Sequence, residues 1–102
     1  MEERPLTTSY DDATSTLLVS GSVDELSGVA LREAIDKHSE GCTQDMSVNL
    51  TDVDFLPSLG IGVLAIAMRT AEENGSRIDL VAADGTIAQQ VLNICGLPHR
   101  QN

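Results

Sequence analysis

The sequence predicts one α/β domain in which a mixed four-stranded sheet is packed against three helices. Short β-prone runs alternate with segments of helical periodicity, in the order β-β-α-β-α-β-α. A short turn can join the first two strands as an antiparallel pair, whereas later strands separated by helices favour parallel pairing. The 102 residues suffice for one modest core, and the 2% aromatic content means that this core is aliphatic.

The chain is expected to begin with a β-hairpin. Leu6–Tyr10 and Thr16–Ser20 are short runs rich in β-prone residues. They flank Asp11–Ala13, where two aspartates are typical of a turn. These segments supply the first two strands.

The first helix is predicted from its start and stop residues. Ser22 and Glu25 have the spacing of a capping box, which predicts a helix that runs to about Ser39. Gly41 is expected to end it. Its apolar side would hold Leu26, Ala30, Leu31, Ala34 and Ile35.

The middle of the chain predicts a strand, a central helix and another strand. Met46–Leu50 is the expected strand, followed by a tight loop. Leu59–Asn74 has helical periodicity and is closed by Gly75. Ile78–Ala82 then has the composition of a buried strand.

The last predicted helix opens at Thr86, which has capping-box spacing with Gln89. Gly96 and Pro98 are expected to end it. An apolar face is predicted from the positions i, i+4, i+7 and i+8, namely Ile87, Val91, Ile94 and Cys95.

The net charge of the chain limits the kinds of partner that we expect it to bind. The formal net charge of −10 argues against nucleic-acid binding and against docking on an anionic membrane. It favours a protein partner with a basic face. The segment Met1–Pro5 lacks the apolar core of a secretion signal, no apolar run reaches the ~20 residues of a membrane span, and the two cysteines are expected to be reduced. We therefore expect a cytoplasmic protein.

Ser58 is the candidate regulatory residue. It precedes a long apolar-periodic stretch, where an N-cap belongs, and the positive end of a helix favours a phosphate there. Gly60 and Gly62 would leave bare backbone beside Ser58 for a partner. The alternative is a plain N-cap, which contributes ~1 kcal/mol to helix stability.

Three segments resemble the STAS domain of bacterial anti-sigma factor antagonists. Gly21-Ser22-Val23-Asp24 is similar to the family's Gly-x-x-Asp after the second strand. Asn49 to Val63 is similar to its switch segment, and Val91 to Leu97 to the helix that ends in Gly-Leu. The resemblance covers nearly the whole chain and implies a single STAS domain, residues 1–102, with the three helices on one face of the sheet.

The chain departs from the family pattern beside Ser58. In the family, the first serine of Asp-Ser-Ser/Thr-Gly takes the phosphate, and Ser58 occupies that place. The aspartate is Pro57 here, and the second hydroxyl residue is Leu59. The chain also stops soon after Gly96-Leu97, where a typical antagonist continues into one more strand and helix, so we expect a domain shortened at its C-terminus.

The resemblance implies a non-enzymatic binding protein that needs no cofactor. Such a protein binds an anti-sigma factor, often a serine kinase, and so releases the sigma factor. Phosphorylation of Ser58 would weaken that binding, and a phosphatase would reset it. The expected partner-binding residues are Asp24, Ser58, Leu59, Gly60, Gly62, Val63 and Ile66.

The central helix carries an apolar stripe beyond its expected core face. Leu59, Val63 and Ile66 adjoin the face that holds Ile61 and Leu64. One interpretation is a helix that is buried more deeply than usual. The other is that the stripe contacts a partner near Ser58.

The sequence gives little support for a nucleotide, zinc, disulfide or catalytic site. Gly60 to Ala65 fits a dinucleotide fingerprint, yet the preceding strand is expected to end too early for it. His38, Cys42, Cys95 and His99 could be ligands of zinc, but glycines interrupt each pair and a buried cysteine is the commoner case. A disulfide between the two cysteines is a further possibility, and no nucleophile–base pair suggests an enzyme.

Two alternatives to the antagonist stay open. The first is a non-switching STAS scaffold or accessory subunit of a stress-signalling or transport complex, which Pro57 and Leu59 favour. The second is a small nucleotide-binding module, motivated only by Gly60 and Gly62.

Overall fold

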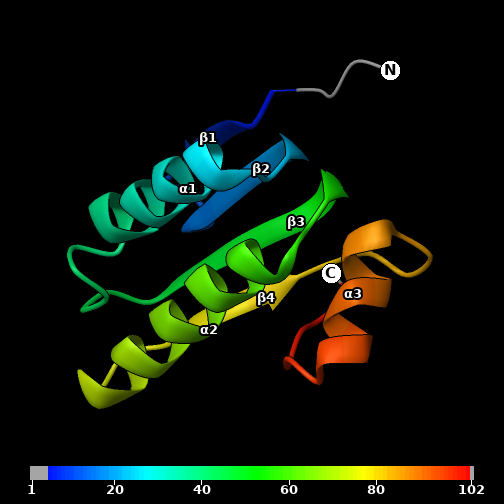
Figure 1. The fold of residues 1–102 in the computed structure, drawn as a ribbon. Coiled ribbons are helices and arrows are strands. Elements are labelled where there is room, and N and C mark those ends of the chain that lie inside the picture. The colour runs from blue at the N-terminus through cyan, green and yellow to red at the C-terminus, as the bar shows by residue number, and fades with distance from the viewer. Residues whose placement is uncertain (1–4, 102) are drawn as a thin grey trace.

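A computed structural model describes residues 5–101 and contains the seven predicted elements in the predicted order. Residues 1–4, part of the segment that argues against a secretion signal, lie outside the described part. No helix within residues 5–101 is long and apolar enough to cross a membrane. The elements in Figure 1 are β1 (Thr7–Asp11), β2 (Thr16–Ser22), α1 (Glu25–His38), β3 (Met46–Phe55), α2 (Ser58–Glu73), β4 (Ile78–Val81) and α3 (Ile87–Cys95).

The four strands form one mixed sheet in the order β1-β2-β3-β4. The hairpin pairs β1 with β2 antiparallel, and β3 is parallel to both β2 and β4. Because β2, β3 and β4 are parallel and each is followed by a helix, α1, α2 and α3 all begin beyond the carboxyl ends of these strands (Figure 1). The predicted fold class is confirmed.

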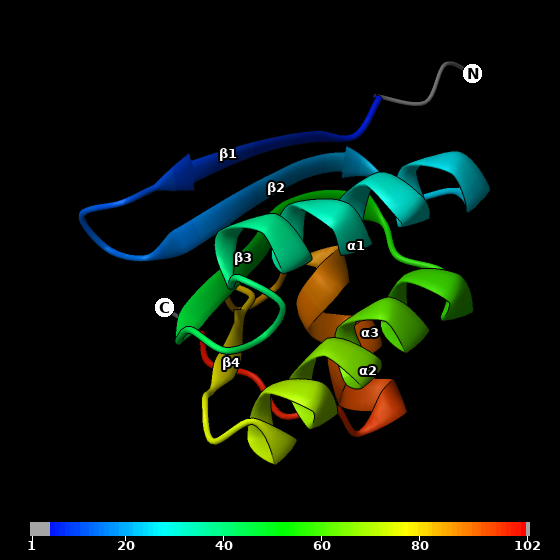
Figure 2. The ribbon, with the colours of Figure 1, turned by 90° about the vertical axis from the view of Figure 1, so that its left-hand side faces the viewer.

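The core lies between one face of the sheet and the helices. Along β3, Val48 and Leu50 are fully buried while Ser47 and Asn49 on the opposite face are only partly covered. Fully buried leucines from all three helices belong to the same cluster, namely Leu31, Leu64 and Leu92. Figure 2 shows α1 and α2 side by side over this face. The helices therefore share one face, as the resemblance implies.

Strand β3 is longer than predicted. It continues to Phe55 instead of ending near Leu50, because Asp52, Val53 and Phe55 still pair with the end of β2. Val53 is buried, so this half of the strand also contributes to the core. Asp52 and Asp54 are therefore strand residues with exposed side chains, whereas the sequence predicts a loop at these positions.

Helix α1 begins differently from the prediction. Its capping box joins Asp24 to Ser27, whereas the predicted pair of Ser22 and Glu25 does not form one, because Ser22 still belongs to β2. Leu26 is 86% exposed and therefore outside the core, while Gly28 is buried.

The inward face of α3 also differs from the prediction. Ala88 and Leu92 are fully buried, whereas Ile87, Ile94 and Cys95 are exposed. The buried face is centred on Ala88 and Leu92, whereas the predicted face followed the i, i+4, i+7, i+8 spacing from Ile87. Of the predicted face, Val91 is partly buried against the core, whereas the prediction is wrong for Ile87, Ile94 and Cys95.

The C-terminal segment closes the free edge of β4. The Arg100 amide donates to the Leu80 carbonyl, and the Ala82 amide donates to the Arg100 carbonyl, both at 2.8 Å. The Arg100 guanidinium also donates to the Ser47 hydroxyl at 3.0 Å. The two backbone bonds extend the sheet by one bridge beyond β4.

Candidate functional site

Ser58 is the first residue of α2, and Pro57 is its N-cap. Pro57 has φ −77° and ψ 173°, and its carbonyl accepts the Ile61 amide at 3.1 Å. The prediction that Ser58 caps the helix is therefore wrong by one position: proline has the extended geometry of the cap and leaves Ser58 inside the first turn. The Ser58 side chain is exposed.

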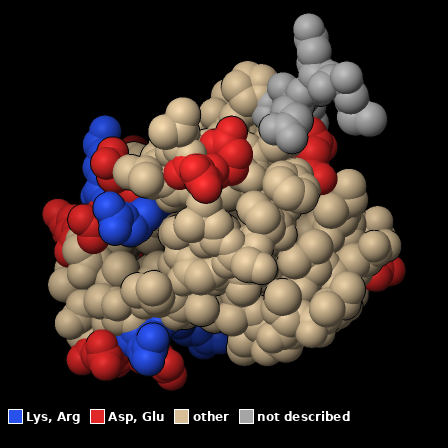
Figure 3. All heavy atoms as spheres, viewed as in Figure 1, with Lys and Arg blue, Asp and Glu red and all other residues tan. Residues whose placement is uncertain are grey.

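The start of α2 has no side-chain cap and no negative charge in its first turn. Pro57 makes no side-chain cap hydrogen bond, and the first turn contains no acidic residue. The first amides of a helix have no intrahelical acceptor, so they present partial positive charge beside Ser58. Residues 55–68 carry no charge, and Figure 3 shows a broad uncharged surface over the helices, with the charged side chains toward its margins.

Gly60 serves packing inside the protein. It is buried, and a Cβ on Gly60 would lie 2.8 Å from Leu56 Cδ1 and 3.1 Å from Val23 Cγ1. The expectation that Gly60 leaves backbone free for a partner is therefore wrong, because Val23 and Leu56 occupy that space. A Cβ on Gly62 would meet nothing within 4 Å, so Gly62 alone leaves open space.

A groove of about 440 Å³ lies between α1 and α2. Its lining includes five predicted partner-binding residues from α2, namely Ser58, Leu59, Gly62, Val63 and Ile66. Leu59 is 45% and Ile66 59% exposed, whereas Val63 is partly buried against the core. The interpretation that the stripe is deeply buried is therefore wrong for Leu59 and Ile66.

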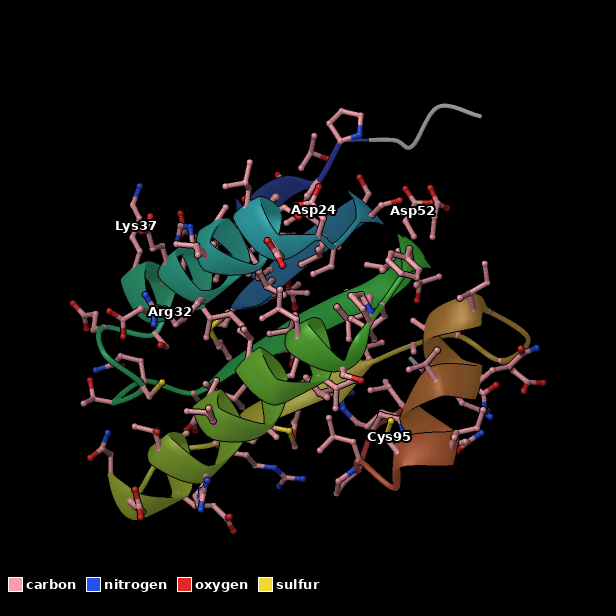
Figure 4. The ribbon with its side chains drawn as sticks, in the orientation of Figure 1. Asp24, Arg32, Lys37, Asp52 and Cys95 are labelled. Atoms are coloured by element: carbon pink, nitrogen blue, oxygen red, sulfur yellow. The ribbon has the colours of Figure 1, made fainter. Side chains whose placement is uncertain are left out.

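Asp24, the N-cap of α1, does not line the groove. The Val23 amide donates to the Phe55 carbonyl at 3.0 Å, which holds the start of α1 next to the end of β3. Asp24 accepts the Ser27 amide at 2.8 Å, and hydrogen bonds from the Ser27 amide and hydroxyl lower the pKa of the Asp24 carboxyl. Figure 4 shows Asp24 at the first turn of α1.

The groove also contains residues that the sequence interpretation missed. Arg32, Ile35 and Asp36 line it from α1, and Thr70 lines it from α2. Figure 4 shows Arg32 on the lower side of α1. Arg32 and Asp36 stand four residues apart with opposite charge, a spacing that could have marked them as neighbours on one helix side.

The two cysteines lie in different parts of the fold and form no disulfide. Cys42 is buried in the α1–β3 loop and Cys95 is exposed on α3, and both are free thiols. Among residues 5–101, no three potential ligands gather to hold a metal ion. His38 stacks on Tyr10 with ring centroids 4.2 Å apart, which joins the hairpin to α1. The burial of Gly60 also leaves its backbone unavailable to a dinucleotide phosphate.

Residues 6–99 match the sequence profile of the family described as "Mlab, STAS domain". The chain is 27% identical over 93 residues to the anti-sigma-F factor antagonist RsfB of two Mycobacterium tuberculosis strains, CDC 1551 / Oshkosh and H37Rv. That alignment covers 90% of this chain and 74% of RsfB.

Solved structures show the same fold. An anti-sigma factor antagonist from Mycobacterium paratuberculosis superposes with a TM-score of 0.73 at 24% identity, over 91% of this chain and 80% of that one. The antagonist SpoIIAA in its unphosphorylated form gives 0.67 at 21% identity, over 91% and 82%. The phosphorylated form of Bacillus SpoIIAA gives 0.65 at 20% identity, over 91% and 85%.

The family match extends over nearly the whole described chain, and the element order, the mixed sheet and the helix-covered face agree with these structures. The chain belongs to the STAS-domain family.

Proposed function

We propose that this protein is an anti-sigma factor antagonist that is switched by phosphorylation of Ser58. The observation that carries the proposal is the exposed Ser58 at a helix start without a side-chain cap, beside a largely apolar groove. The similarity to RsfB over 90% of the chain supports the choice of partner. The partner would be an anti-sigma factor with serine kinase activity, and the exchange would take place in the cytoplasm.

In the unmodified protein, the apolar side of α2 binds the partner. Leu59, Gly62, Val63 and Ile66 supply the contact, because Leu59 and Ile66 are about half exposed on one side of the helix. Asp24, at the start of α1, offers a carboxylate to a basic partner residue at the edge of this contact. Gly60 supports the site indirectly by its packing against Leu56. The protein acts by binding and contributes no catalytic group.

Phosphorylation changes the charge of this surface while leaving the fold intact. A phosphate on Ser58 adds about −1.5 to −2 charges where residues 55–68 carry none. The amides at the start of α2 stabilise that anion, so α2 tolerates it. An apolar partner surface would have to desolvate the phosphate, which opposes binding. A phosphatase that removes the group restores binding.

The test uses purified anti-sigma factor kinases of the same organism. We expect phosphate on Ser58 by mass spectrometry after incubation with ATP, none on Ser58→Ala, and at least a roughly tenfold weaker complex after modification, about 1.4 kcal/mol. Ser9→Asp, an exposed serine on β1, is the matched charge control and should bind as wild type does. Unchanged binding by the fully phosphorylated protein would overturn the switch.

A second candidate is a STAS accessory subunit that does not switch. Pro57 favours it, because the N-cap offers no carboxylate beside Ser58 to a kinase. The description of the matching family, "Mlab, STAS domain", differs from that of the antagonists and also favours it. Phosphate transfer to Pro57→Asp but not to wild type would establish this candidate, whereas efficient transfer to wild type would exclude it.

A further inference from the structure

We propose that the groove between α1 and α2 is the docking site for a single amphipathic helix of the partner protein. This inference rests on the proposed function only for the identity of that partner. The α2 residues that line the groove extend from Ser58 to Thr70. At 1.5 Å per residue this is a length of about 18 Å, which corresponds to roughly three turns of a helix.

The two helices approach each other closely near one end of the groove. At Gly28, an added Cβ would lie 3.1 Å from Leu59 Cδ2, so α1 and α2 approach each other closely there. The α1 residues that line the groove begin one turn later, at Arg32. The floor consists of apolar side chains, among them Ile35 and Ala67, and Gly62 leaves room between the walls.

Exposure along both rims favours a protein helix over a small molecule. Leu59 and Ile66 on α2 are 45% and 59% exposed, and Arg32 and Asp36 on α1 are also exposed. A small molecule inside the groove would leave these rims in water. A helix that lies along the groove would cover both rims, which is a recurrent mode of recognition between proteins.

Charge defines the chemistry of that helix. The α2 rim is uncharged, whereas the α1 rim carries Arg32 and Asp36 four residues apart. Among residues 5–101, the ion pairs of the structure involve other residues and leave both side chains available. The complementary helix therefore has apolar residues on one side, with an acidic and a basic residue one turn apart along its flank.

The same groove explains how Ser58 could control the partner. Ser58 lines one end of the groove, so a phosphate there would face the end of the docked helix. An acidic end of that helix would be repelled, and an apolar end would have to desolvate the phosphate.

The experiment titrates a stapled helical peptide into the full ¹⁵N-labelled chain. The peptide has about 14 residues, with leucines at i, i+3, i+7 and i+10 and a Glu–Lys pair one turn apart on one flank. A peptide of the same composition with the leucines dispersed around the helix is the control. We expect amide shifts at Gly62, Val63 and Ile66 with the first peptide only. Shifts elsewhere, or none at about 1 mM peptide, would overturn the proposal.

Two matched variants test the location. Gly62→Trp fills the groove, and because a Cβ at Gly62 meets open space, the variant should fold and bind the peptide at least roughly tenfold more weakly. Ile94→Trp places the same side chain on α3, where Ile94 is 85% exposed, and should bind as wild type does. Equal affinities for the two variants, with native-like spectra, would overturn the proposal.

The outcomes separate this inference from the proposed function. An anti-sigma factor that binds wild type and Gly62→Trp equally would overturn the groove and leave the antagonist function standing. A chain that binds the peptide in the groove but binds no anti-sigma factor would sustain the groove and overturn that function.

Discussion

Two glycines two residues apart in α2 have opposite roles at the residue scale. Gly60 is buried against Leu56 and Val23, whereas a side chain at Gly62 would extend into open space. Both cost helix propensity, so their presence calls for separate explanations. Packing accounts for Gly60, whereas the space beside Gly62 would accept a side chain.

This difference predicts opposite effects of alanine. At Gly62, alanine should raise the free energy of unfolding by about 0.5–1 kcal/mol, because only helix propensity changes. At Gly60, overpacking against Leu56 costs about 1–3 kcal/mol and outweighs that gain. Chemical denaturation of both variants measures this, and a stabilised Gly60→Ala would contradict the packing that we describe.

Asp24 predicts a pH dependence of stability. Its pKa is lowered in the folded protein by hydrogen bonds from the amide and hydroxyl of Ser27. A lowered carboxyl pKa contributes stability that is present above the unfolded pKa of about 4 and is lost as the pH falls through the folded value. Asp24→Asn retains a capping side chain but cannot ionise.

The wild type should therefore lose more stability than Asp24→Asn between pH 6 and pH 3. Thermal melts at several pH values measure both profiles. Parallel profiles for the two proteins would show that the Asp24 cap does not depend on its charge.

At the scale of elements, α2 has one side in the core and another in the groove. Leu64 is fully buried, while Ile66, two residues later, is 59% exposed. Leu64→Ala should cost about 2–5 kcal/mol of folding stability, whereas Ile66→Lys should change it by less than about 0.5 kcal/mol. Ile66→Lys should nevertheless weaken partner binding, and calorimetry together with thermal melts separates the two effects.

Val63 is less suited to this test than the sequence suggests. It is partly buried and packs against the core, so Val63→Lys would disturb the fold as well as the partner surface.

A large loss of stability in Ile66→Lys would contradict the assignment of this side of α2 to the surface.

The order of the elements could be predicted from the sequence because periodicity and turn residues mark most of them clearly. Gly96, for example, ends α3 in the left-handed conformation that glycine favours. Which side of a short helix faces inward could not be predicted. In α3, Ala88 and Leu92 are buried because of where the sheet lies, and this tertiary fact overrides the larger isoleucines.

The candidate site was predictable only in part. Ser58 and the α2 stripe follow from local sequence, and the structure places both beside one groove. Arg32 and Asp36 could not be assigned to it, because that requires the packing of α1 against α2. The role of Gly60 likewise depends on Val23, which is distant in the sequence.

At the scale of the whole molecule, charge opposes compactness. The net charge of −10 is carried by 102 residues, and mutual repulsion of like charges destabilises the folded state at low ionic strength. Raising sodium chloride from about 10 mM to 150 mM shortens the Debye length from roughly 30 Å to 8 Å. The melting temperature should therefore rise with salt, by scanning calorimetry, and a fall would indicate that attractive pairs dominate.

The tight packing of Gly60 has a consequence for how the protein can signal. Leu56 and Val23 pack closely around Gly60, and such close packing favours one position of the first turn of α2. A ligand or a modification shifts a conformational equilibrium only where two conformations are available. We therefore expect the backbone of α2 to be the same before and after phosphorylation. The partner would then distinguish the two forms only by the charge and hydration of the surface at Ser58.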